Sequence, residues 1–342
     1  MATVLDAQFG IKAESTYGTP VTVDRFHELM PGDGFDYRPN RVQGSGLRVG
    51  AIGPRANRRV TPNGDYGGSF NLEVLSKGFG VLLNLMCGGT PTNTVVSGTT
   101  YQVVHTLGGV LKPFTGQLGV PRIQADGSAV VDPFTATGCT IPSWGLSLDN
   151  ADILKLKIDV DARDMSTATA LATASYPTGS VAHPVALFSF AGAALYGGAY
   201  TAATTTALAI GGTPLANITN FSMDVTRNAD VARFLAGAGG KKAIPIPGLA
   251  GVTGTLGIEY SDTVYRDAFL ADTDLTLVAN FTAGTLSTGL ETFQVAIPNI
   301  RLDGELPKPT GETTKATCNF TALENLTNPL LQLIQRTSDT TL

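Results

Sequence analysis

The feature that most constrains the fold is a near-perfect alternation of apolar and charged residues in "DILKLKIDVDA" at 152–162. Apolar residues from Ile153 to Val160 are separated by Lys155, Lys157, Asp159 and Asp161. A period of two predicts a strand with one buried and one polar face. Other segments also resemble strands: 68–74, 100–107, 143–150, 220–228, 254–262, 274–281, 292–304 and 314–323. Helices are expected only at 75–86 and 261–272, so the fold class is mainly β.

Composition agrees with many strands joined by turns, because the chain contains 40 glycines and 19 prolines. Only 15% of its 342 residues are charged, well below the usual quarter or so. A surface this poor in charge suggests that copies of the chain cover one another. The net charge of −5 argues against the basic face with which proteins grip DNA phosphates.

Signals for catalysis and for metal binding are missing from the sequence. The three cysteines, Cys87, Cys139 and Cys318, are odd in number and form no CxxC. The histidines His27 and His105 are far from each other and from His183 in sequence. We therefore expect a protein that is no enzyme and has no cofactor or metal. Neither a signal peptide nor an apolar run of about 18 residues is evident, so no membrane partner is expected.

Two stretches of the chain resemble each other at an offset of 186 residues. "GSFNLEV" at 68–74 matches "GTLGIEY" at 254–260, and a helical segment follows each. Glycine-rich basic stretches precede them at 44–59 and 231–248. We interpret this order as two β modules, 1–170 and 171–342, joined near 171–184. A single elaborated module with an outer decorating domain would also use the length.

The two glycine-rich basic stretches are candidate assembly arms. A loop of about 25 residues is uncommon in a compact domain without a purpose. Folded as a hairpin with legs of ~12 residues, each arm would reach ~40 Å, far enough to touch a neighbour. The alternative is a solvated surface loop. The candidate arm residues are Arg41, Arg48, Arg55, Arg58, Arg59, Arg227, Lys241 and Lys242.

Several short segments resemble the major tail tube proteins of tailed bacteriophages, particularly the long-tailed phages of actinobacteria. They are "FGIKAESTYGTPVTVDRFHELM" at 9–30, "SGLRVG" at 45–50, "GGSFNLEV" at 67–74, "VAIPNIRLDGELP" at 295–307 and "TCNFTALEN" at 317–325. The resemblance covers nearly the whole chain. It implies a tail-tube β-sandwich or barrel module with a flanking helix, assembled into rings with a continuous inner β-barrel. It also implies that the N-terminal turn and strand of the first module form an assembly arm, laid onto an adjacent subunit or ring.

The resemblance also implies partners and a location. Stacked rings of three or six copies would enclose the tape-measure protein and later conduct double-stranded DNA. Tail terminator and baseplate or distal tail proteins would bind the ends, with assembly in the host cytoplasm and a final place in the virion tail. A baseplate hub, decoration or fibre protein, or a membrane β-barrel, remain alternatives. Acidic residues lining the lumen would repel DNA, and the strand-borne candidates are Asp149, Asp159, Asp161, Asp224 and Glu259.

Overall fold

A computed structural model describes residues 6–179, 183–214, 218–236, 239–261, 263–304, 306, 309, 314–340 and 342. Its centre is a band of eight antiparallel strands, in which every neighbour is hydrogen-bonded to the next. In spatial order these strands are β3 (Gly34–Gln43), β4 (Arg59–Glu73), β9 (Lys155–Ala162), β8 (Ala129–Leu148), β13 (Ile218–Thr226), β14 (Gly251–Glu259), β17 (Lys315–Ala322) and β16 (Leu290–Gly304).

Two of these strands leave the band and enter a second layer. The first half of β8 pairs with β7 (Phe114–Ile123) and β10 (Asp164–Ser166), and β7 pairs with β1 (Gln8–Ala13), which also pairs with β2 (Arg25–His27). The first half of β16 pairs with β15 (Leu275–Thr285) and β18 (Gln332–Thr337). β8 and β16 therefore occupy corresponding places in the two halves of the chain.

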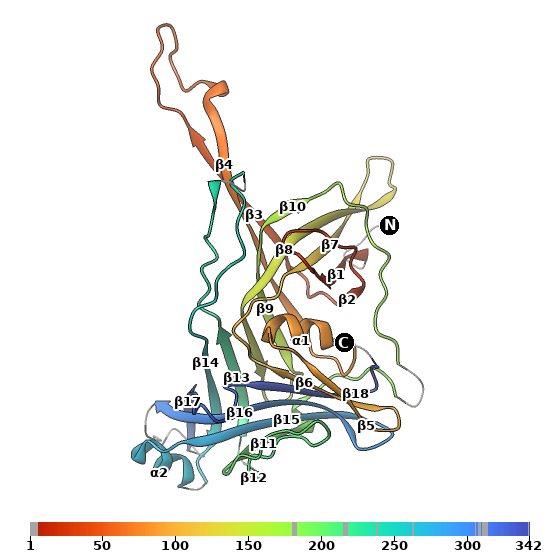
Figure 1. The fold of residues 1–342 in the computed structure, drawn as a ribbon, viewed down its shortest axis with the longest axis vertical. Helices are drawn as coiled ribbons and strands as arrows, with labels where there is room; N and C mark the ends of the chain where they lie inside the picture. Colours follow the sequence, from red (N-terminus) through yellow and green to blue (C-terminus); the bar gives the residue numbers. More distant parts are fainter. Residues whose placement is uncertain are drawn as a thin grey trace.

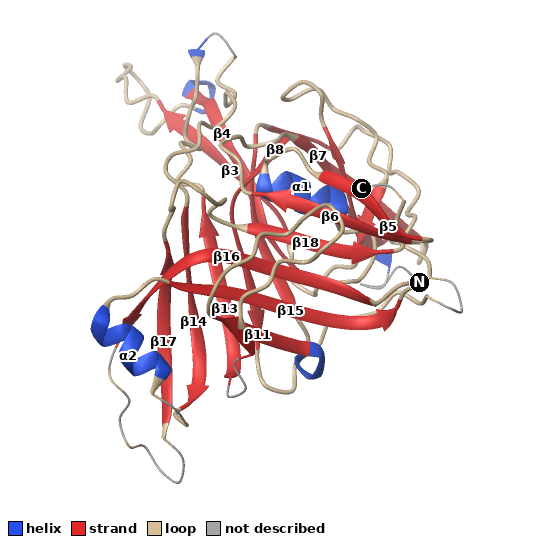
Figure 2. Cartoon of the chain, turned by 60° about the horizontal axis from the view of Figure 1, so that its bottom comes forward, coloured by secondary structure: helices blue, strands red, loops and turns tan. Residues whose placement is uncertain are grey.

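The second layer of the C-terminal half contains strands from both halves. β18 pairs with β6 (Thr100–Thr106), which pairs with β5 (Thr92–Ser97). β15 pairs with β11 (Ala193–Gly197), which pairs with β12 (Thr213–Pro214). These strands run across the band (Figures 1 and 2). β6 thus ties the N-terminal half to the C-terminal strand.

One apolar core fills the space between the layers. It is continuous from Phe9 and Phe70 in the N-terminal half to Phe281 and Phe293 in the C-terminal half. The alternation in β9 is as expected, because Leu156 and Ile158 are buried while Lys157 is exposed. The fold is mainly β, and the two helices expected from sequence are present as α1 (Gly80–Cys87) and α2 (Val264–Ala271).

The two helices sit in different surroundings. In α1, six of eight residues are buried, Leu82 and Leu85 among them. In α2, by contrast, Leu270 is 63% exposed. Sequence periodicity placed both helices but did not separate these environments. It also missed β1, β3, β5, β7, β10, β11, β12 and β18. Glycines and prolines interrupt β3 and β7, and several of the others are short.

The segment "TYGTP" at 16–20 forms a turn. The Thr19 amide donates to the Thr16 carbonyl at 3.0 Å, and Gly18 takes a φ of 75° that favours glycine. The Glu14 carboxylate accepts from the Gly18 amide at 2.7 Å and from the Gly138 amide at 2.9 Å. These hydrogen bonds hold the turn against the middle of β8, so the turn packs on the body of its own chain.

Candidate assembly surfaces

The first glycine-rich stretch is the end of a long hairpin. β3 and β4 pair from Gly34 opposite Ser69 to Gln43 opposite Arg59, and the hairpin projects well beyond the body (Figure 1). No residue from 44 to 58 is buried. Within this tip, Leu47, Val49 and Ile52 have relative exposures of 101%, 101% and 107%. The tip of the arm therefore carries three fully exposed aliphatic side chains within a polar segment.

The second glycine-rich stretch lies beside the base of the first arm. Isolated bridges join Asp230 to Ile246 and Phe234 to Lys242. Gly240 approaches the Pro62 carbonyl so closely that a Cβ there would clash. The turn of the second arm thus packs against the lower part of the first arm, which reaches farther from the body (Figure 1).

Lys242 links the second glycine-rich stretch to β4 and β9 through ion pairs. Its ammonium group is 1% exposed and forms ion pairs with Asp65 of β4 and Asp161 of β9. It also lies 5.8 Å from the centroid of the Phe234 ring. Burial raises the pKa of Asp161 to about 6, although the hydrogen bond and the charge of Lys242 act in the opposite direction. The Lys242 side chain therefore makes its ion pairs inside the chain. The sequence analysis had instead expected it on an arm that contacts a neighbour.

Arg227 is the second expected arm residue that lies inside the chain. It is 1% exposed at the end of β13, and its guanidinium donates to the carbonyls of Cys87 (3.3 Å), Gly108 and Val110 (3.5 Å). It therefore joins the C-terminal half to the end of α1 and to the loop after β6. Lys241 pairs with Asp164. On the first arm, Arg41, Arg48, Arg58 and Arg59 are exposed and Arg55 is partly buried.

The band has one polar and one apolar face. Asp159 lies on the polar face, where it accepts from the hydroxyls of Ser69 (3.0 Å) and Ser143 (2.9 Å). The register puts Asp161, Asp224 and Glu259 on the same face, with Asp161 largely covered by Lys242. Asp149 lies beyond the end of β8, so it is not carried by a strand as expected.

Acidic residues outnumber basic ones on this polar face. The strands of the band place eight acids and five bases on this face, and Lys242, which packs on it against Asp65 and Asp161, brings the net formal charge to −2. The acids are Asp36, Asp65, Glu73, Asp159, Asp161, Asp224, Glu259 and Asp303, and the bases are Arg38, Lys155, Lys157, Arg301 and Lys315.

Both ends of the band have an unpaired strand edge among the described residues. β3 pairs with β4 alone. At the other end, β15 accompanies β16 only as far as Ile300, so Arg301 to Gly304 pair on one side, with β17. Sequence analysis missed both edges, because an edge depends on which strands become neighbours. Natural proteins usually cover such edges or pair them.

The residues that the structure describes offer no metal site and no membrane-spanning helix. They hold no cluster of three or more His, Cys, Asp or Glu suited to a metal ion. None of the helices in that part of the chain is long and apolar enough to cross a bilayer.

A comparison with protein families gives one match of nearly full length. The family model described as phage tail tube protein matches residues 5–322. No curated protein matches the chain.

Proposed function

Since this chain belongs to the phage tail tube protein family and is a structural component of the virion tail, we propose that three copies close into a ring through the two unpaired edges of the band. Each copy would contribute two modules, about 1–170 and 171–342, to a ring with pseudo-six-fold symmetry. The unpaired edges of β3 and β16 carry this proposal.

The internal contact between the halves supplies a template for the contact between copies. Inside the chain, β8 and β13 pair edge to edge, with Ser143 opposite Thr226. At the 186-residue offset, Asp65 corresponds to Gly251 and Ser69 to Thr255. Arg38 pairs with Asp65 as Thr226 pairs with Gly251, so Arg38 is the counterpart of Thr226. Asp303 lies two strands away from Thr255, as Ser143 lies two strands away from Ser69, so Asp303 is the counterpart of Ser143. Repeating the contact between copies therefore places Asp303 opposite Arg38, with complementary charges.

The number of strands favours three copies over six. Eight strands per copy make 24 in a ring of three. At ~4.8 Å between strands and a tilt of 35–45°, such a barrel would be about 45–50 Å across between strand centres. Barrels of 16–18 strands already enclose water, so 24 strands leave a wide channel. A ring of six copies joined in the same way would have twice as many strands and therefore twice the circumference.

The polar face of the band suits the lining of this channel. It carries more acids than bases, so a DNA phosphate backbone would be repelled overall and would pass without a fixed binding site. The channel would hold the tape-measure protein before ejection and conduct double-stranded DNA afterwards. In this proposal Asp159, Asp224 and Glu259 face the lumen.

The projecting arms would stack one ring on the next. Arg48, Arg58 and Arg59 are exposed on the first arm and would face the adjacent ring. Assembly would take place in the host cytoplasm, with tail terminator and baseplate or distal tail proteins at the two ends.

Negative-stain microscopy of the concentrated, untagged protein tests the proposal. We expect hollow tubes whose end-on averages show three copies per ring. Native mass spectrometry should detect a ring of 3 × 35.5 kDa, or about 107 kDa. A ring of six copies would contradict the proposed edge pairing.

Charge exchange at the edges tests the pairing itself. Asp303→Arg and Arg38→Asp should each reduce ring formation, and the double variant should restore it. Exchange of Arg122 and Asp132, an exposed ion pair on the β7–β8 hairpin, is the matched control. Undiminished ring formation in both single variants would rule out this register.

A further inference from the structure

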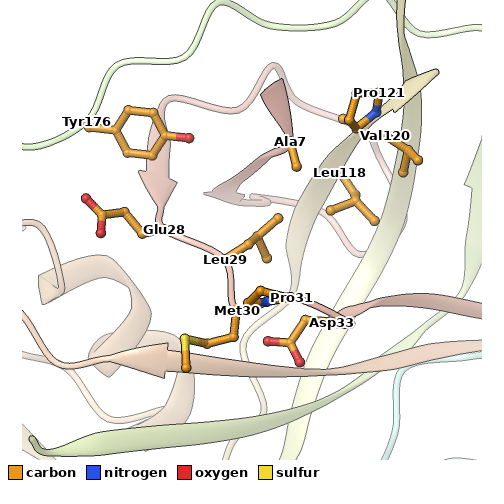
Figure 3. Close-up of a pocket in the computed structure, with 12 residues that line it drawn as sticks. Ala7, Glu28, Leu29, Met30, Pro31, Asp33, Leu118, Val120, Pro121 and Tyr176 are labelled. Carbon is orange, nitrogen blue, oxygen red and sulfur yellow. The ribbon is translucent and has the colours of Figure 1, made fainter. Parts of the chain in front are cut away.

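A cleft of about 600 Å³ lies at the base of the arm, just before β3 begins (Figure 3). The loop before β3 contributes Leu29, Met30 and Pro31, and β7 contributes Leu118 and Val120. These side chains give the cleft an apolar lining. Its volume is large enough to admit more than one aliphatic side chain.

Carboxyl groups stand beside this apolar lining. Glu28 is exposed and forms no ion pair with any described residue. Asp33 is engaged, since its carboxylate accepts from the Asn71 backbone amide at 2.5 Å and from its side-chain amide at 2.8 Å. The cleft therefore offers an apolar site with an available negative charge at its side.

The tip of the arm has the complementary composition. Leu47, Val49 and Ile52 are fully exposed, and Arg48 lies between the first two. The sequence order places one positive charge among aliphatic side chains. This matches one available carboxylate beside an apolar lining.

The tip cannot reach the cleft of its own chain. The loop from 28 to 33 leads directly into β3, and the paired hairpin then carries the tip away from the body (Figure 1). From Asp33 to Arg48 is 15 residues, or about 50 Å of extended strand at ~3.3 Å per residue. The tip is therefore available only to a second copy.

The reach of the arm fits a stack of rings. Tilted by 35–45°, as strands are in barrels, an arm of about 50 Å spans roughly 35–40 Å along the barrel axis. A second copy displaced by that distance along the axis would bring its cleft level with the tip. The spacing is set by the length of the hairpin alone.

We propose that the arm tip, Leu47, Val49 and Ile52, docks in this cleft of a second copy in the next ring, with Arg48 opposite Glu28. The inference rests on the proposed ring-and-tube function, and it names the surface that receives the arm. It also sets the axial repeat of the tube at roughly 35–40 Å.

Cysteine pairing tests the contact directly. All proteins carry Cys318→Ser, because Cys87 and Cys139 are already buried. Ile52→Cys protein is mixed with Val120→Cys protein under oxidising conditions, and the disulfide-linked dimer is identified by mass. In the matched control, Leu326→Cys protein takes the place of Val120→Cys protein. Leu326 is 90% exposed and lies outside the cleft. We expect the dimer with Val120→Cys and little with Leu326→Cys, whereas equal yields would overturn the proposal.

Charge exchange provides a second test. Glu28→Arg and Arg48→Glu should each raise the protein concentration needed for stacking roughly tenfold, and the double variant should restore it. Rings should still form in the single variants, because their closure uses the β3 and β16 edges. Tubes that stack normally in both single variants would overturn the docking site while leaving the proposed function intact. Failure of the unaltered chain to form rings would count against both.

Discussion

The positively charged side chains of Lys242 and Arg227 are buried inside the chain. The two side chains bind different kinds of acceptor. Lys242 is neutralised by the Asp65 and Asp161 carboxylates, while Arg227 is satisfied by backbone carbonyls. Burial lowers the pKa of the Arg227 guanidinium. Such residues are sensitive to the loss of a partner, because the remaining group stays in a poorly solvated place.

Lys242→Met should lower the free energy of unfolding by about 3 kcal/mol, since it leaves Asp161 buried without its cation. Lys241→Met is the matched control and should cost less than about 1 kcal/mol, because its ion pair with Asp164 is more exposed. Denaturant unfolding monitored by circular dichroism measures both. Equal losses would show that burial does not distinguish the two lysines.

Two buried histidines predict destabilisation in acid. Burial lowers the pKa of His27 to about 4 and that of His105 to about 3. Both are neutral in the folded chain, whereas the unfolded chain takes up protons below about pH 6.5. The stability associated with their neutral form is thus present above pH 6.5 and is lost as the pH falls towards 4, by about 1.4 kcal/mol per pH unit for each histidine.

Replacing both residues, His27→Gln with His105→Gln, should flatten this dependence between pH 6.5 and 4. His183→Gln, at a partly exposed position, is the control. Asp161 acts in the opposite direction, because its raised pKa makes stability fall as the pH rises from about 4 to 6. Its contribution is the same in all three proteins and cancels in the comparison. An unchanged pH slope in the double variant would contradict the prediction.

At the scale of elements, the β3–β4 hairpin contains two parts with different roles. Its base belongs to the band, where Phe70 and Leu72 are buried. Its tip has no buried residue. The same two strands therefore stabilise the fold at one end and carry exposed aliphatic side chains at the other. Because the parts are separate, the tip can be removed without disturbing the core.

Removal of the tip should abolish stacking and leave the fold intact. Gly44 and Arg58 already face each other across the hairpin, since the Gly44 amide donates to the Arg58 carbonyl at 2.8 Å. Residues 45–57 can therefore be replaced by an Asn-Gly turn. We expect an unchanged Tm by calorimetry and no tubes by microscopy. Tubes of normal length would contradict the assignment of the tip as an assembly element.

At the scale of the whole molecule, the proposed modules are interleaved. β18 from the C-terminal end lies between β16 of its own half and β6 of the other. The apolar core is also shared by both halves. A similar order of elements in each half therefore does not imply two units that fold independently.

Separate expression of residues 1–170 and 171–342 should give two poorly folded fragments, because each loses strand partners and core contacts. Co-expression should restore a soluble complex with the far-ultraviolet circular dichroism of the intact chain. Independent cooperative unfolding of either fragment would show that the shared strands are dispensable.

The sequence alone determined the local features of this protein. Alternation in 152–162 predicted a half-buried strand, and the first glycine-rich basic stretch marked the tip of the β3–β4 hairpin. These signals are local, because side-chain period and turn residues act within a few positions. The resemblance in short segments indicated the tail tube family, which the family comparison confirms.

Only the tertiary structure decided which residues meet. It buried Lys242 and Arg227, which the sequence had grouped with the exposed arm residues. Among the residues that the structure describes, it also left β3 and the end of β16 with an unpaired edge. It also placed Leu29 and Val120 in one cleft, although 91 positions separate them. Burial and strand partnership depend on contacts between distant segments, and no short pattern encodes those contacts.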